Sequence, residues 1–356
     1  MRILVWHVHG GWMNSFVRGR HEYLLPTLPE GGPWGLGRGG RDWPASAREC
    51  AADQLREEDL DAVVLQRPEE IAECQRLTGR TPGRDLPAIY LEHNTPKGQV
   101  PSSVHPLADQ ATIPIAHVTH FNELFWDNGR APTRVIEHGI VDPGEQYTGE
   151  RACQSVVVNE PVRRGRVTGT DLLAHFAQQA PLEVYGMGTG ALNGLAGLGP
   201  ERAHICGDLP TAELHAQLAR TRLYLHPVRW TSLGLSLLEA MHLAMPVVVL
   251  ATTEAVRAVP AEAGAISTDV AELARAVRIL IADPEEARRR GRVARAAALS
   301  RYGLARFLDD WDELLSSVVS QHHSHRTRRQ PQVHQPSSRE DGARSTAPRS
   351  TEGSSR

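Results

Sequence analysis

The sequence of 356 residues is poor in cysteine, in long apolar runs and in net charge. Its four cysteines (Cys50, Cys74, Cys153 and Cys206) are scattered and form no C-x-x-C pair, which argues against a disulfide framework or a zinc ribbon. No stretch approaches the roughly 20 apolar residues that cross a bilayer, so no membrane span is expected. The formal net charge of −3 gives no reason to expect a nucleic acid or an anionic membrane as the main partner.

The amino terminus also lacks the features of a secretory leader. The chain opens directly on a short apolar run, without a basic segment followed by a long apolar core. Together with the scattered cysteines, this pattern favours a soluble, cytoplasmic protein in a reducing compartment.

Short apolar runs recur along the chain and are separated by stretches with helical periodicity. Runs of this kind, without alternation, are typical of strands buried on both faces of a parallel sheet, and the helices between them supply the crossovers. The pattern predicts an α/β fold of two doubly wound parallel sheets, each Rossmann-like. The expected strands are 3–8, 62–65, 88–91, 115–119, 134–137, 155–158, 182–186, 203–206, 223–225, 246–250 and 265–267.

Composition divides the chain into three parts. Residues 142–151 contain Asp-Pro-Gly and Thr-Gly-Glu, which interrupt the periodicity, so we expect one domain over 1–148 and a second over 149–320. From about Gln321 onward there are almost no aliphatic residues, and Ser, Arg, His, Gln and Pro dominate. This composition predicts a disordered tail over 321–356, for which we expect no function.

The segment 229–241 is the most informative stretch of the sequence. An expected strand runs into a turn, 231–234, that carries hydroxyl groups and glycine and opens an apolar helix. Such a turn directs free backbone N–H groups and the positive end of a helix dipole to one place, where an anion can bind. Glu239 is the single charge within the apolar run 233–241, and a ribose diol would satisfy its carboxylate. The combination predicts a nucleotide site.

This segment resembles the donor-site signature of the retaining glycosyltransferases of the GT-B fold, of the family four (group 1) type. The family pattern is roughly P-S-x-x-E-G-F-G-L-x-x-x-E-A-M-A-x-G-x-P-V-V; here 226–235 reads HPVRWTSLGL and 239–248 reads EAMHLAMPVV. The second glutamate of the pattern is present, whereas threonine replaces the first, which usually faces the transferred sugar. The resemblance implies that the donor is bound by Thr231, Ser232, Leu233, Gly234 and Glu239.

Three arginines, Arg163, Arg164 and Arg166, follow the expected strand 155–158. One interpretation is a solvated turn. The other is a clamp on a diphosphate, because a guanidinium group presents a planar fork of donors that matches phosphate oxygens. The position resembles the family's G-R-x-x-x-x-K-G-x-D-L-L element, with the lysine replaced by Thr168, and which arginine takes its place stays open.

The resemblance also implies roles for residues at other strand ends. Gly10 and Gly11 resemble the family's first loop, where the backbone approaches the donor phosphate and the acceptor. His93 matches a histidine that lines the cleft near the transferred sugar, and it is our candidate catalytic residue; a strand-end histidine bonded to a backbone carbonyl is the alternative. Gly188 resembles a turn near the nucleobase.

No metal is expected in this site. His7 and His9 share one face of a strand, but the sequence offers no evident third ligand nearby. Asp59 and Asp61 form an Asp-x-Asp pair that precedes its strand, which favours a solvated loop. Arginine and a helix dipole can stabilise a leaving diphosphate without a metal.

The resemblance therefore implies a GT-B enzyme that moves a hexose-like sugar from a nucleotide-diphosphate sugar to an unidentified acceptor hydroxyl across an interdomain cleft. It also implies that the anomeric configuration of the sugar is retained. The nucleotide sugar is a co-substrate, and no cofactor is expected. Two alternatives stay open. One is a sugar-nucleotide epimerase of the same fold, with Glu92 and Glu160 as candidate carboxylates; the other is an idle nucleotide-binding homologue, suggested by Thr231 and Thr168. A dehydrogenase is disfavoured because no G-x-G-x-x-G follows a strand with an acidic residue about 20 positions later.

Overall fold

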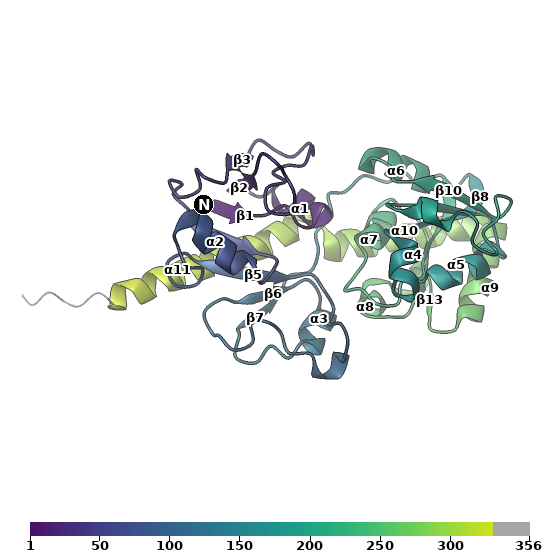
Figure 1. Cartoon of the computed structure of the whole chain (residues 1–356). Helices are drawn as coiled ribbons and strands as arrows, with labels where there is room; N and C mark the ends of the chain where they lie inside the picture. Colours follow the sequence, from purple (N-terminus) through teal and green to yellow (C-terminus); the bar gives the residue numbers. More distant parts are fainter. Residues whose placement is uncertain (330–356) are drawn as a thin grey trace, which may run out of the picture.

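The computed structural model describes residues 1–329, with side chains described as far as residue 324. Two lobes are visible, each built on one sheet with helices around it (Figure 1). The first sheet has seven strands in the order β3-β2-β1-β4-β5-β6-β7, and the second has six in the order β10-β9-β8-β11-β12-β13. Neighbouring strands are parallel throughout both sheets. The doubly wound α/β fold predicted from the sequence is confirmed.

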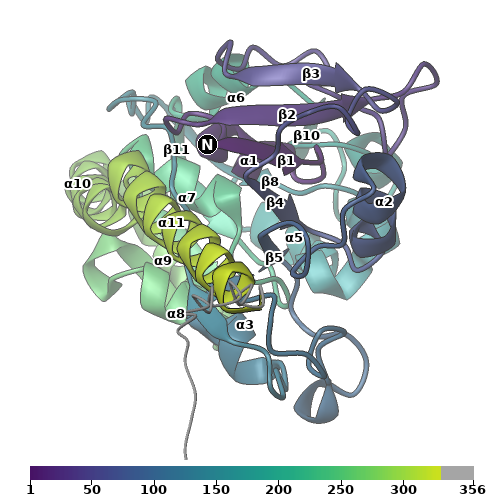
Figure 2. The ribbon, with the colours of Figure 1, turned by 90° about the vertical axis from the view of Figure 1, so that its left-hand side faces the viewer.

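Helices bury the first sheet on both faces. Trp12, Phe307 and Trp311 belong to the core on one face, whereas Cys74 and Leu77 belong to the core on the other. Figure 2 shows α11 and α2 on opposite sides of this sheet. The elements of the first lobe are β1 (Arg2–Val5), α1 (Gly10–Phe16), β2 (Glu22–Thr27), β3 (Ala47–Ala51), β4 (Ala62–Leu65), α2 (Glu70–Thr78), β5 (Ala88–Glu92), η1 (Val100–Ser102), β6 (Ile115–His117), α3 (His120–Phe125) and β7 (Thr133–Val135).

The second sheet is covered in the same way. Leu237 and Met241 pack with Val247 on one face, while Phe176 and Leu273 pack with the other. The elements of the second lobe are β8 (Arg151–Val157), α4 (Pro161–Arg164), η2 (Gly165–Thr168), α5 (Thr170–Ala177), β9 (Leu182–Tyr185), η3 (Thr189–Leu192), β10 (Ala203–Gly207), α6 (Thr211–Leu218), β11 (Thr221–His226), α7 (Leu235–His242), β12 (Val247–Leu250), α8 (Ala255–Ala258), η4 (Ala261–Ala263), β13 (Gly264–Ser267), α9 (Val270–Ala282) and α10 (Pro284–Tyr302).

Two strands of the first sheet, β2 and β3, were not among those expected. β2 contains Pro26, and β3 lies at the edge of the sheet, where its burial alternates instead of being continuous. Arg48 of β3 pairs with Glu22 of β2 and with Glu58. Charged residues are tolerated at a sheet edge such as β3, whereas the proline lies in β2, one strand inside the edge. Both features hide the apolar runs on which the prediction relied.

The last helix, α11 (Leu304–Arg329), returns from the second lobe to the first sheet. Its helical range extends beyond Gln321, so residues 321–329, which we expected to be disordered, continue the helix. A helix already packed at Phe307 and Leu315 needs no further aliphatic residues to propagate, because each added residue gains one backbone hydrogen bond. The rest of the predicted tail, 330–356, lies outside the described residues. None of the helices of residues 1–329 is both long and apolar enough to cross a membrane.

Candidate functional site

The loops after β8 and β11 meet at the carboxyl end of the second sheet. The backbone N–H of Arg229 donates to the carbonyl oxygen of Val167 at 2.9 Å. Gly169 lies at the same contact with a φ of +75°, and a Cβ there would be 2.0 Å from the carbonyl oxygen of Pro227. Glycine is required at this position both by the backbone conformation and by the closeness of the neighbouring loop. The arginine-bearing turn therefore lies beside the turn 231–234.

Carboxylates distinguish the three arginines of this turn. Arg163 is 3.6 Å from Glu160 and Arg166 is 2.9 Å from Asp171, and these two guanidinium groups are 71% and 75% exposed. Arg164 is half-buried and forms no ion pair with the described residues. Burial, together with the nearby Arg163, lowers the pKa of Arg164. Arg164 is thus the arginine whose charge is not already matched by an acid.

Asp171 is shared by Arg166 and Arg229. The two nitrogens of the Arg229 guanidinium are 2.5 and 2.9 Å from the two carboxylate oxygens, a bidentate geometry. The hydrogen bonds from Arg229 lower the pKa of Asp171. Asp171 therefore fixes the loop after β11 to the first turn of α5.

The turn 231–234 opens α7 as the sequence predicts. Gly234 precedes the first helical residue, with φ of −73° and ψ of 120°. Ser232 is buried and Thr231 half-buried. Leu233, which we expected to contact the donor, has its side chain in the core under the helix, so its contribution to a ligand is limited to its backbone N–H.

Glu239 is nearer the surface than its apolar neighbours suggested. Its side chain is 22% exposed, and Oε2 lies 3.5 Å from Nε2 of His215 on α6. From the sequence we expected the carboxylate of Glu239 to have a ligand as its partner. The structure shows that the imidazole of His215 also lies beside it. The partial exposure leaves the carboxylate accessible to a hydroxyl group.

Gly188 ends the turn after β9. Its φ of +69° is in the left-handed region, and a Cβ would be 3.0 Å from a carboxylate oxygen of Glu160. Because Glu160 begins α4, the loops after β8 and β9 are also in contact. Gly188 itself is exposed at this edge of the sheet.

Gly10 and Gly11 form the first turn of α1 and face the second lobe. A Cβ on Gly11 would be 2.7 Å from Cδ1 of Leu235, the first residue of α7. A Cβ on Gly10 would be 2.6 Å from the guanidinium of Arg41. The amino ends of α1 and α7 therefore approach each other across the two lobes, as Figure 1 also shows.

His93 follows β5 and is 9% exposed. Its Nε2 is 3.1 Å from Oε1 of Gln66, so the partner is a side-chain amide and not the backbone carbonyl considered above. The ring centroid lies 3.9 Å from that of His9 and 5.5 Å from that of Trp12. Burial, and then the neighbouring His9 and His138, lower the pKa of His93 well below 6.5.

Other buried imidazoles surround this region. Burial lowers the pKa of His9 and of His138 to about 4. His226, at the end of β11, is 4% exposed and its pKa is lowered to about 4 by burial alone. These rings are neutral near pH 7 and are not cations.

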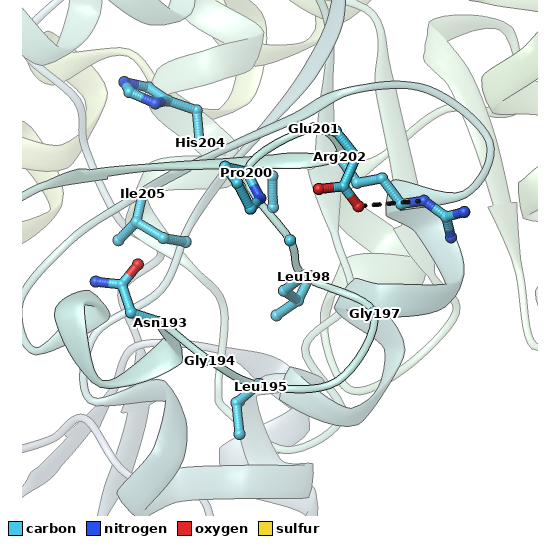
Figure 3. Close-up of a pocket in the computed structure, with 12 residues that line it drawn as sticks. Asn193, Gly194, Leu195, Gly197, Leu198, Pro200, Glu201, Arg202, His204 and Ile205 are labelled. Carbon is cyan, nitrogen blue, oxygen red and sulfur yellow. Dashed lines mark ion pairs between the residues drawn. The ribbon is translucent and has the colours of Figure 1, made fainter.

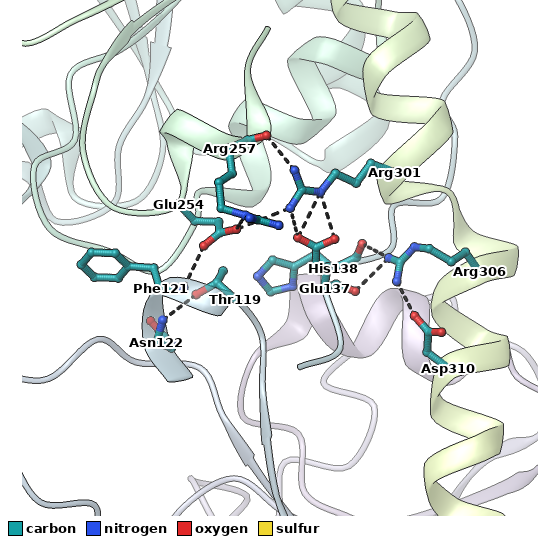
Figure 4. Close-up of polar contacts among 10 residues, drawn as sticks. All are labelled: Thr119, Phe121, Asn122, Glu137, His138, Glu254, Arg257, Arg301, Arg306 and Asp310. Atoms are coloured by element: carbon teal, nitrogen blue, oxygen red, sulfur yellow. Dashed lines mark hydrogen bonds and ion pairs between the residues drawn. The ribbon is translucent and has the colours of Figure 1, made fainter. Parts of the chain in front are cut away.

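A polar network joins the two lobes (Figure 4). Glu254, just before α8 and 1% exposed, accepts a hydrogen bond of 2.8 Å from the backbone N–H of Phe121 on α3. The same carboxylate is 2.9 Å from Arg257 and 3.6 Å from Arg301, which also binds Glu137. We call these five residues the interdomain network.

The two carboxylates considered for an epimerase lie in different environments. Glu92 accepts hydrogen bonds from Asn94 and lies 3.2 Å from Nε2 of His105, in the first lobe. Glu160 belongs to the second lobe and pairs with Arg163. Nothing in these contacts forms a carboxylate pair. Within residues 1–329 there is also no group of three or more His, Cys, Asp or Glu side chains placed to bind a metal ion.

A surface hollow of about 530 Å³ lies elsewhere, at the edge of the second sheet (Figure 3). It is lined by residues 193–205, which lead into the amino end of β10. None of the predicted site residues lines it. Ligands of parallel α/β sheets bind at the carboxyl ends of the strands, so we place the site at the converging loops and not in this hollow.

Sequence reasoning missed several residues of this region. Gln66, Arg229 and Glu254 each make a contact described above, and each follows a strand at its carboxyl end. That position was the available signal, because polar residues just after buried strands face the functional edge of such a sheet. Which partner each residue takes depends on how the loops fold back, and no local pattern encodes this.

Comparisons with known proteins agree with this geometry. Residues 170–283, which contain α5 to α9, match the family model described as Glycosyl transferases group 1. No curated protein matches the sequence.

Solved structures resemble the whole two-lobed architecture. The sucrose-phosphate synthase of Thermosynechococcus elongatus superposes with a TM-score of 0.68 at 14% identity, over 90% of this chain and 100% of that one. HepE of Anabaena, solved with UDP and glucose, gives a TM-score of 0.67 at 14% identity, over 89% and 100%. A glycosyltransferase of Rickettsia africae gives 0.62 at 11% identity, over 89% and 98%. The fold is GT-B, and residues 170–283 are similar to the glycosyl transferases group 1 family.

Proposed function

We propose that this protein transfers a hexosyl group from a nucleoside-diphosphate sugar to an acceptor hydroxyl, with retention of configuration and without a metal. The observation that carries the proposal is the convergence of three features on one edge: the amino end of α7, the unpaired Arg164 and the first turn of α1. The first two suit a diphosphate, and the third comes from the opposite lobe, where an acceptor would bind.

In this proposal the second lobe binds the donor. Arg164 and the N–H groups of residues 232–234 contact the diphosphate, and Glu239 accepts hydrogen bonds from the ribose hydroxyls. As the glycosidic bond breaks, negative charge develops on the leaving diphosphate, and the fixed cation and helix dipole stabilise it. The leaving phosphate oxygen takes the proton of the incoming hydroxyl, so no protein base is needed for a retaining transfer.

The first lobe would bind the acceptor and face the transferred sugar. Gly11 brings the first turn of α1 close to Leu235 of the second lobe, and His93, in a neutral form, packs against His9 just before this turn. We propose that His93 contacts the sugar by hydrogen bonding and does not act as a charged acid.

We propose UDP-sugars as the donors to test first. The solved HepE structures of Anabaena contain UDP-glucose in one case and UDP with glucose in another. A ligand that binds the native state raises the melting temperature, so thermal shifts with UDP-, GDP- and ADP-sugars rank the nucleotides. Release of free nucleotide, with and without candidate acceptors, then measures hydrolysis and transfer.

Glu239→Ala tests the donor site. We expect at least a tenfold weaker binding of the nucleotide, since hydrogen bonds to a charged group contribute about 1.5–3 kcal/mol. Glu213→Ala on the neighbouring α6 is the matched control, because Glu213 is exposed. Wild-type nucleotide affinity in Glu239→Ala would show that the site assignment is wrong.

An idle nucleotide-binding homologue remains the second candidate, favoured by one contact. Thr168, at the family's lysine position, is 2% exposed and its hydroxyl donates to the carbonyl of Gly165 at 3.1 Å. The side chain of Thr168 therefore stabilises its own loop and provides no positive charge for a diphosphate. Donor binding without any release of sugar would favour this candidate over the transferase.

A further inference from the structure

Gln66 connects the carboxyl ends of three neighbouring strands of the first sheet. Gln66 follows β4. Its Nε2 is 2.7 Å from the carbonyl oxygen of Trp6, which follows β1. Its Oε1 is 3.1 Å from Nε2 of His93, which follows β5. Gln66 is 3% exposed. A buried amide with both ends engaged has one orientation.

That orientation determines the tautomer of His93. The carbonyl of Trp6 has only lone pairs to offer, so the amide nitrogen of Gln66 must face it. The amide oxygen then faces His93, and an oxygen that accepts requires a proton on Nε2. In a neutral ring Nδ1 consequently carries the lone pair.

The backbone of Gln66 is fixed by a second contact. Its N–H donates to Oε2 of Glu70 at 2.6 Å, and Arg67 donates to the other oxygen of the same carboxylate at 2.8 Å. Glu70 is fully buried in the first turn of α2. The amide is therefore held from its backbone as well as from Trp6.

The surroundings of His93 leave Nδ1 available. The aromatic neighbours are His9 and Trp12, and no hydrogen bond joins Nδ1 to any side chain or backbone group of the described residues. The ring retains 9% exposure. His9 and Trp12 flank Gly10 and Gly11 in the sequence, so His93 packs against the same turn that approaches the second lobe.

We propose that Gln66 is the positioning residue that locks His93 in the Nε2–H tautomer and so makes Nδ1 an acceptor for a hydroxyl of the bound sugar or acceptor. The tautomer depends on the fold alone. Its use in recognising a hydroxyl rests on the function proposed above. The site consequently favours a substrate with a hydroxyl group that donates a hydrogen bond to Nδ1 of His93. It disfavours a deoxy analogue that lacks this hydroxyl.

The tautomer is tested by nitrogen NMR on the full chain labelled with ¹⁵N-histidine, with His93→Gln used to assign the signals. We expect Nε2 of His93 to be protonated and Nδ1 to be of the lone-pair type at pH 7.5. In Gln66→Met, which keeps the length but removes the amide, the two tautomers should mix. A protonated Nδ1 in the wild-type chain would overturn the proposal, whether or not any sugar is transferred.

Kinetics test the positioning role. We expect Gln66→Met to lower kcat/KM about tenfold, and to lose the discrimination between a sugar and its deoxy analogue that the wild type shows. The control is Gln154→Met, another buried glutamine, whose amide donates to backbone carbonyls of Phe176 and Ala180 in the second lobe. It should cost similar stability but keep the discrimination.

The two arms separate the possible failures. The predicted tautomer with unchanged discrimination in Gln66→Met would overturn the positioning role. Absence of transfer with every donor would contradict the proposed function instead, and the NMR result would still decide the tautomer. If Gln66→Met does not fold, the wild-type spectrum alone provides this decision.

Discussion

Single carboxylates decide which cations of this protein are free to bind a ligand. Glu160 pairs with Arg163, and Asp171 pairs with Arg166 and Arg229, so Arg164 is left without an acid among the residues that the structure describes. Three arginines within four positions look equivalent in the sequence. The difference between them arises from Glu160 at the start of α4 and from Asp171, which the loop after β11 also contacts.

Arg164→Met should weaken nucleotide binding about tenfold, since a charge-assisted hydrogen bond to phosphate is lost while the apolar stem is kept. Arg163→Met is the control and should change binding less than twofold, because that guanidinium is 71% exposed and already paired. Calorimetric titration with UDP measures both. Equal losses in the two variants would contradict the assignment to Arg164.

Buried neutral histidines predict how stability depends on pH. The pKa of His9, His117, His138 and His226 is lowered to about 4 by burial, against 6.5 for an exposed histidine. Between these values the unfolded chain binds more protons than the folded one, so the free energy of unfolding falls as pH decreases from about 6.5 to 4.

Each such histidine contributes a slope of about 1.4 kcal/mol per pH unit. Urea unfolding at several pH values, followed by the fluorescence of the core tryptophans of the first lobe, measures this slope. His138→Asn should reduce it by about one histidine's share. A slope that begins only below pH 4.5 would point to carboxylates and contradict this prediction.

At the scale of elements, close packing explains a glycine inside a helix. Gly291 lies in α10, where a Cβ would be 1.9 Å from the carbonyl oxygen of Ala244 in the loop before β12. Ala244 itself has a φ of +68°. The helix thus lies directly against a loop that cannot retreat without moving β12.

Gly291→Ala should therefore destabilise the second lobe by about 1–3 kcal/mol, the usual cost of overpacking, although alanine favours helices. Gly190→Ala is the matched control, because nothing lies within 4 Å of a Cβ at that position. Thermal unfolding compares the two. An increase in melting temperature for Gly291→Ala would mean that the loop yields and that the contact is not as close as described.

Elements also show what the sequence could and could not predict. The apolar runs at 62–65 and 182–186 are interior strands that are buried at seven of their eight positions, and the sequence located them within one residue. β3 at the sheet edge has Arg and Glu within five residues and gave no such signal. The turn 231–234 was predicted from its composition, whereas the contacts of Gln66 and Glu254 depend on residues distant in sequence and were not.

At the scale of the whole molecule, the interdomain network fixes how the lobes meet. Glu254 is buried and receives the N–H of Phe121 from the opposite lobe. Burial is the largest single influence on the pKa of Glu137 and raises it, but the hydrogen bonds and the charge of Arg301, together with the charge of Arg306, give a net downward shift. Glu137 therefore loses its proton more readily than an exposed glutamate does.

Glu254→Ala should loosen the two lobes. It leaves a buried N–H and the guanidinium group of Arg257 without their carboxylate, while Arg301 keeps Glu137, at a cost of about 2 kcal/mol or more. We expect thermal unfolding to separate into two transitions and the radius of gyration from X-ray scattering to increase. Glu285→Ala, an acid 90% exposed on α10, should leave both measurements unchanged. A single transition at the wild-type temperature in Glu254→Ala would contradict the coupling.

The return of α11 to the first sheet has a consequence for how the chain is made. Phe307, Trp311 and Leu315 complete a core whose other members come from residues 3–136. A ribosome that has finished residue 148 has synthesised every strand of the first sheet but not the helix that covers it. The first lobe is thus synthesised first but completes its core last. One face of its sheet stays partly exposed until the second lobe and α11 have been synthesised.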